Sequence, residues 1–135
     1  FFSFPDGILK MEFTYFPFIR IEQKQKFGEL FIFFLIDIAT NKLFTIYQKP
    51  RSRDFIDLYF ILTRNPELTL GSLIEKAQIK FDNYMDPVQL GAQYTKATEL
   101  KDYPRMLEKL EENVWQDFFM VEAEKLSSKI FDLNR

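Results

Sequence analysis

Residues 36–46 read IDIATNKLFTI, and the apolar side chains in this stretch recur at three- and four-residue steps. The recurring positions are Ile36, Ala39, Leu43 and Ile46. This spacing matches the period of an amphipathic helix. Asp37 lies where a carboxylate caps or favours a helix N-terminus, and Pro50 ends the helix. We therefore predict that the chain is helical from Ile36 onward.

Proline divides the rest of the chain into five further predicted helices. The second runs from about Arg53 to Arg64 and stops at Asn65-Pro66, and the fourth opens at Asp86-Pro87 and runs to about Ala97. Apolar stripes indicate the third helix, a short helix after Tyr103-Pro104, and the last helix. The third stripe is Leu70, Ile74, Ala77, Phe81 and Tyr84. The short helix carries Met106, Leu107 and Leu110, and the last stripe is Phe119, Ala123, Leu126, Ile130 and Leu133.

Before Ile36 the pattern is that of strands. Apolar side chains alternate with polar ones from Leu9 to Tyr15, and the alternation continues from Phe18 to Glu22. Residues 30–34, LFIFF, are a continuous apolar run typical of a strand buried on both faces. The predicted fold is α+β and mostly α, with two or three strands in residues 1–35 and a five- to six-helix bundle in residues 36–135.

The composition indicates a soluble globular protein with a single core, because 47% of the 135 residues are hydrophobic, 28% are charged and the net charge is -2. The absence of Cys and His excludes disulfides, thiolate or imidazole metal sites and histidine-based catalysis. Any metal must be held by oxygen ligands, which favours Mg²⁺, Mn²⁺ or Ca²⁺. No apolar run is long enough for a membrane span and no secretion signal is present, so a cytoplasmic location is expected. The 17 Phe and 6 Tyr make an oligomer contact plausible.

The predicted second helix carries the side chains that best indicate chemistry. Residues 53–62, RDFIDLYFIL, are apolar nearly all round, which predicts a buried helix, yet Asp54 and Asp57 lie on one side of it. A buried carboxylate needs a cation, a metal or several donors, and this applies to Asp57 in particular. The nearby cations are Lys42, Lys49, Arg51 and Arg53. Either Asp57 pairs with Lys42 or Arg53 as a structural anchor, or the cations face a polyanionic substrate and the carboxylates orient them.

Two linked motifs resemble a known family. Residues 37–43, DIATNKL, and residues 51–59, RSRDFIDLY, are similar to the paired D-x-x-x-N-K-L and R-D-x-x-D-L motifs of the AbiEii/AbiGii nucleotidyltransferase toxins. In that family a helical half follows a nucleotidyltransferase sheet. The resemblance implies that residues 1–35 complete such a sheet and that residues 36–135 form the helical domain.

The resemblance also implies site roles. Lys42 would contact nucleotide phosphate with Asp37, Arg51 and Arg53 as further NTP-binding residues, and Asp54 and Asp57 would be catalytic carboxylates supported by Arg53. Glu12, in Lys10-Met11-Glu12-Phe13, stands where the family has a strand Asp, and it could ligate a metal only with carboxylates from elsewhere. The alternative for Glu12 is an exposed strand residue paired with Lys10.

One family feature is missing from this sequence. Such enzymes hold Mg²⁺ with an Asp-x-Asp pair, and no Asp-x-Asp or Asp-x-Glu occurs here. The first residue is Phe1, so we expect either a longer protein that supplies this motif upstream or a truncated copy. The leading hypothesis is the C-terminal part of an NTP-dependent nucleotidyltransferase toxin, inactive alone, with Mg²⁺, NTP and a cognate antitoxin implied by the family. Neither cofactor is expected to bind tightly to this chain alone.

Two other functions remain open at this point. The first alternative is a non-catalytic helical interaction module or a degenerate toxin homologue. A nucleic-acid-binding domain is disfavoured because cations do not gather outside residues 42–53. We expect nucleic acid to be bound only as an acceptor substrate of the complete enzyme.

Overall fold

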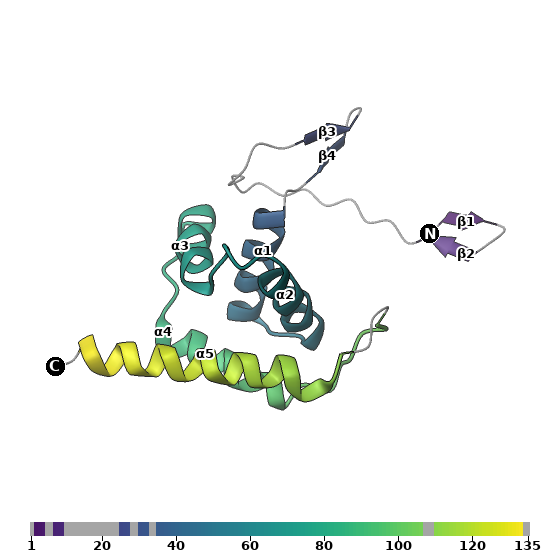
Figure 1. Cartoon of the computed structure of the whole chain (residues 1–135). Coiled ribbons are helices and arrows are strands. Elements are labelled where there is room, and N and C mark those ends of the chain that lie inside the picture. The colour runs from purple at the N-terminus through teal and green to yellow at the C-terminus, as the bar shows by residue number, and fades with distance from the viewer. Residues whose placement is uncertain are drawn as a thin grey trace.

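The computed structural model describes residues 2–4, 7–9, 25–27, 30–32, 35–106 and 110–133, and side-chain surroundings are described within the last two ranges. Within them the chain is mostly helical, as predicted (Figure 1). The described helices are α1 (Leu35–Gln48), α2 (Ser52–Arg64), α3 (Leu70–Phe81), α4 (Pro87–Thr95), the single 3₁₀ turn η1 (Lys96–Thr98) and α5 (Glu112–Leu133).

Two short antiparallel strand pairs precede the helices. β1 (Phe2–Phe4) pairs with β2 (Gly7–Leu9), with Phe2 opposite Leu9. β3 (Gln25–Phe27) pairs with β4 (Leu30–Ile32), with Lys26 opposite Phe31. The alternating segment at residues 10–24, which includes Glu12, lies outside the described residues. A nucleotidyltransferase sheet in residues 1–35 therefore stays a prediction.

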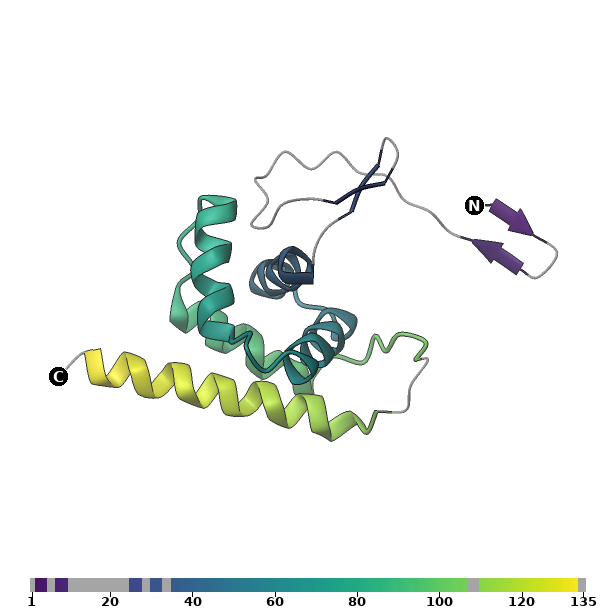
Figure 2. The same ribbon diagram turned by 45° about the horizontal axis from the view of Figure 1, so that its top comes forward.

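The helices pack around one core. α1 contacts α2, α3 and α4, while α5 contacts α4, η1 and α2. Figures 1 and 2 both show α5 running along one side of the shorter helices. Aromatic rings join these elements, because Phe119 of α5 lies 4.7 Å from Phe55 of α2 and 5.5 Å from Tyr94 of α4, measured between ring centroids. The helical order predicted from the prolines is thus confirmed for α1 to α5.

The predicted stripe on the third helix was partly wrong. α3 ends at Phe81 because Asp82 adopts a left-handed conformation with φ of 48°, which stops the helix. Tyr84 follows this turn and is exposed, whereas Met85 is buried and donates its backbone N–H to the Gln78 side chain. The stripe also omitted Leu73, which is fully buried on α3.

The predicted short helix after Tyr103-Pro104 is absent from residues 101–106 and 110–111, and its Leu107 lies outside the described residues. Just before this segment, the Asp102 carboxylate accepts hydrogen bonds from the Ser52 backbone N–H at 3.2 Å and from the Ser52 hydroxyl at 2.9 Å. These bonds cap α2 from a distant part of the chain, because Arg51, the residue at the N-cap position, makes no side-chain cap of its own.

Among the helices that the structure describes, none combines the length and the apolar composition that crossing a membrane requires.

Candidate functional site

A cluster of opposite charges joins the C-terminal half of α1 to the first turns of α2. The Lys42 ammonium lies 2.8 Å from Asp57 Oδ2 and 3.1 Å from Asp54 Oδ1. Arg51 donates to both oxygens of Asp54, from Nε at 2.8 Å and from Nη2 at 3.3 Å. We call Lys42, Arg51, Asp54 and Asp57 the lysine–carboxylate cluster.

The two carboxylates of the cluster differ in environment. Asp54 has 1% of its side chain exposed, and Asp57 has 51%. The prediction that Asp57 is largely buried was therefore wrong, and so was the prediction that α2 is buried all round. Asp57 lies three residues after Asp54 on α2, where its carboxylate is exposed to solvent. Both carboxylates are still close enough to contact the Lys42 ammonium. Asp54 is the buried anchor, and Asp57 is the carboxylate that solvent and ligands can reach.

Lys42 stays charged in this setting. Burial by itself would lower the pKa of Lys42, but hydrogen bonds to Asp57 and Asp54, together with their negative charges, outweigh it and raise the pKa above its ordinary value. About a quarter of the side chain, 26%, remains exposed. The cluster thus holds a permanent cation at the protein surface.

The structure separates two of the proposed site residues from this cluster. Arg53 is exposed and has no ion pair within the described part of the chain. Asp37 lies at the α1–α3 contact, where its carboxylate is 2.8 Å from the Lys80 ammonium and both side chains are buried. Sequence reasoning missed Lys80 because this lysine occupies an apolar stripe position on α3, and its partner lies on another helix. Glu12 lies outside the described residues.

The cluster does not offer a metal site by itself. Among the described residues no group of three or more Asp, Glu, Cys or His side chains could hold a metal ion. Asp54 already accepts hydrogen bonds from two cationic side chains, which satisfies the oxygens that a metal would need. The Lys42 ammonium and the Arg51 guanidinium, with side chains 26% and 41% exposed, are the groups of the cluster that could meet an anionic ligand.

Comparison with known proteins identifies the class of protein to which this helical domain and its lysine–carboxylate cluster belong. A family model described as "Nucleotidyl transferase AbiEii toxin, Type IV TA system" matches residues 10–127. The chain belongs to this family. No curated protein and no solved structure matches the chain. The family resemblance seen in the two linked motifs is therefore confirmed.

The unequal burial of the two carboxylates leads to a stability prediction. Asp54→Ala should lower the free energy of unfolding by about 2 to 3 kcal/mol, because it removes a buried acceptor of charged hydrogen bonds. Asp57→Ala should cost less than about 1 kcal/mol, because its ion pair with Lys42 is solvent-exposed on the carboxylate side. Urea denaturation of both variants measures the difference. Equal losses would contradict the assignment of Asp54 as the anchor.

Proposed function

We propose that this chain supplies the phosphate-binding helical part of an NTP-dependent nucleotidyltransferase toxin, and that Lys42 contacts the nucleotide phosphates. The observation that carries the proposal is a protonated, partly exposed lysine held in place by two carboxylates on the neighbouring helix. A purely structural lysine in such a pair can be fully covered, as Lys80 is. Family membership supports the same reading.

A cleft lies next to the cluster on the side of Asp57. It has a volume of about 290 Å³ and is lined by Asp57, Phe60, Arg64 and Arg105, but not by Lys42. In the proposal Asp54 and Asp57 are positioning residues, which fix the Lys42 ammonium, while Arg51 orients Asp54. Arg53 adds positive charge at the solvent side of α2.

Magnesium and the NTP are part of the proposal for the whole enzyme. Mg²⁺ would neutralise charge on the transferring phosphoryl group. The described residues do not fit a metal ion, so its ligands must come from elsewhere, and Glu12 is the candidate that this sequence offers. Because the sequence contains no Asp-x-Asp pair, we propose that this chain alone transfers no nucleotide and binds NTP only weakly.

A protein partner follows from the family description. The family is that of toxins of type IV toxin–antitoxin systems, so we propose a cognate antitoxin as the partner of this chain. A homo-oligomer is a second proposed association. Exposed Val121 and Phe131 on α5 provide apolar surface for such contacts.

Triphosphate binding tests the role of Lys42. We expect the parent chain to bind inorganic triphosphate and ATP weakly, with Kd around 1 mM, in a titration followed by NMR. Lys42→Ala should weaken binding by about tenfold or more, because charged hydrogen bonds to phosphate are lost. The melting temperature of the Lys42→Ala variant should change little. In this variant Asp54 still accepts a hydrogen bond from Arg51, and the Asp57 carboxylate is exposed to solvent.

Lys49→Ala is the matched control. Lys49 is an exposed lysine of the same basic stretch, just after the end of α1, and it takes no part in the lysine–carboxylate cluster. Its removal should leave triphosphate binding within about twofold of the parent chain. A Lys42→Ala variant that melts far lower yet binds triphosphate as well as the parent would reduce Lys42 to a structural residue.

A further inference from the structure

A second cavity lies on another part of the helical bundle. It has a volume of about 410 Å³ and lies between α3, α4 and α5, and the residues of the lysine–carboxylate cluster do not line it. Leu70, Ile74 and Leu126 give it an apolar lining, and Glu122, Lys125 and Lys129 add charged groups. A volume of this order suits a small organic molecule.

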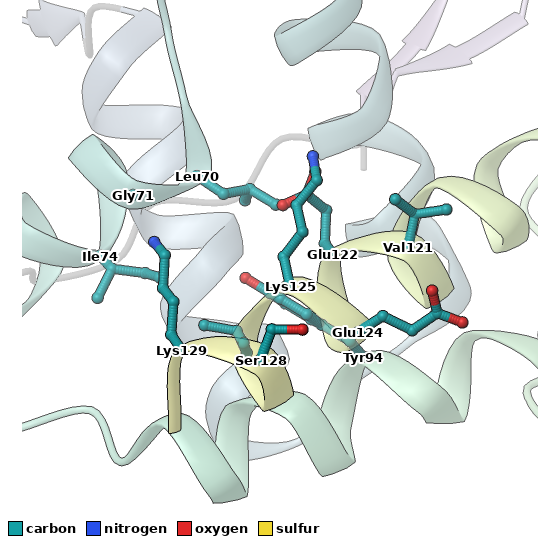
Figure 3. A pocket seen from close by; sticks show the side chains of 11 residues that line it. Leu70, Gly71, Ile74, Tyr94, Val121, Glu122, Glu124, Lys125, Ser128 and Lys129 are labelled. Carbon is teal, nitrogen blue, oxygen red and sulfur yellow. The ribbon is translucent and has the colours of Figure 1, made fainter. Parts of the chain in front are cut away.

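One polar group of the cavity is a buried hydroxyl. Tyr94 lines the cavity, its side chain is 1% exposed, and its hydroxyl makes no hydrogen bond to any residue that the structure describes. A buried hydroxyl that stays unsatisfied destabilises the folded chain, so such groups are uncommon in native proteins. Figure 3 shows the Tyr94 hydroxyl among the side chains that line the cavity. The ring is held in place by Phe119, whose centroid lies 5.5 Å away.

The hydroxyl is available as a proton donor. Burial raises the pKa of Tyr94 well above its ordinary value, and the negative charge of Glu122 adds to this effect. The phenol is therefore neutral at physiological pH and can donate to an acceptor atom. The long side chains of Glu122 and Lys125 line the cavity beside it, and they must rotate for a ligand to reach the buried oxygen.

One cation of the lining has no ion pair among the described residues. The Glu122 carboxylate pairs with the Lys125 ammonium at 2.8 Å. Lys129 is exposed and has no ion pair with any described residue. Glu124 also lines the cavity, but Figure 3 shows its carboxylate directed away from Tyr94 and Lys129. The cation that remains for a ligand is thus Lys129.

We propose that this cavity binds a small organic carboxylate with an apolar body. The carboxylate accepts a hydrogen bond from the Tyr94 hydroxyl and is attracted by Lys129, while the apolar body contacts Leu70, Ile74 and Leu126. This site is separate from the proposed nucleotide site and does not depend on it.

Phenylbutyrate is a suitable probe, with phenylbutanol and phenylbutylammonium as its neutral and cationic counterparts. Ligand-observed NMR with the 135-residue chain should show saturable binding of phenylbutyrate at concentrations around 1 mM, and weaker binding of both counterparts. Tyr94→Phe should weaken phenylbutyrate binding by about tenfold or more, since a charged hydrogen bond is lost. The variant should melt no lower than the parent, because the hydroxyl that it removes is unsatisfied.

Two glycines on helices give a matched pair of variants. Gly71 lines the cavity, and a Cβ there would meet only Thr69 Oγ1, at 3.9 Å. Gly91 does not line the cavity, and a Cβ there would meet nothing within 4 Å. Gly71→Leu should abolish phenylbutyrate binding by filling the space, and Gly91→Leu should leave it unchanged.

Three outcomes would overturn the proposal. The first is no saturable binding of phenylbutyrate by the parent chain. The second is equal or tighter binding of phenylbutylammonium. The third is binding by Tyr94→Phe and Gly71→Leu as tight as by the parent, in variants whose circular dichroism spectra and melting temperatures show an intact fold.

Discussion

Asp37→Leu should lower the free energy of unfolding by about 3 to 5 kcal/mol, the usual cost of removing one partner from a buried ion pair. The Asp37 carboxylate and the Lys80 ammonium lie 2.8 Å apart, with 1% and 0% of their side chains exposed. The substitution removes the carboxylate that neutralises a buried ammonium between α1 and α3. Lys80→Met should cost a similar amount, because it removes the ammonium that pairs with the buried Asp37 carboxylate.

A double-mutant cycle measures this coupling directly. The Asp37→Leu/Lys80→Met variant should lose much less than the sum of the single losses, because neither charge is then left buried. Glu122→Gln provides the surface comparison: Glu122 and Lys125 are also 2.8 Å apart, but 62% of the Lys125 side chain is exposed, so less than about 1 kcal/mol should be lost. Urea denaturation of each variant gives the free energies.

The single variant Asp37→Leu also tests the nucleotide-binding role that the family resemblance implied for Asp37. If Asp37 is an anchor of the fold, Asp37→Leu changes stability far more than it changes triphosphate affinity in molecules that remain folded. If Asp37→Leu kept the parent's melting temperature and lost triphosphate binding, this result would support a nucleotide-binding role for Asp37.

Phe119→Ala should cost about 3 to 5 kcal/mol, the range for truncating a buried Phe. Phe119 is fully buried and lies in the contact of α5 with α2 and α4, with Phe55, Tyr94 and Phe118 around its ring. The rings of Phe55 and Tyr94 cannot close the space that its loss opens, because they are fixed on two other helices, α2 and α4. Thermal and urea denaturation measure the loss.

Phe131 on the same helix is the matched control. Its side chain is 68% exposed, so Phe131→Ala should change the free energy of unfolding by less than about 0.5 kcal/mol. Similar losses from Phe119→Ala and Phe131→Ala would mean that α5 is not held by the ring cluster that the structure shows.

Local sequence patterns were sufficient to predict the helical order. Proline and Asp86 set the beginning of α4, with the Asp86 side chain accepting from the Val88 N–H at 3.0 Å, and Asn65-Pro66 follows the end of α2 as predicted. The linked motifs around Lys42 and Asp54 indicated the family, which the family model confirms. These features are local, because a cap, a break or a motif depends on residues a few positions apart in the chain.

The sequence by itself thus predicted a helical chain from Ile36 onward, with the order of α1 to α5, and placed a lysine and two carboxylates on adjacent helices. Only the tertiary structure decided that Asp54 rather than Asp57 is buried, that Asp37 pairs with Lys80, and that Asp102 caps α2. The physical reason is that burial and ion pairing depend on which helix faces cover one another. Helical periodicity gives the face of each residue on its own helix, but the partner of that face comes from a distant part of the chain.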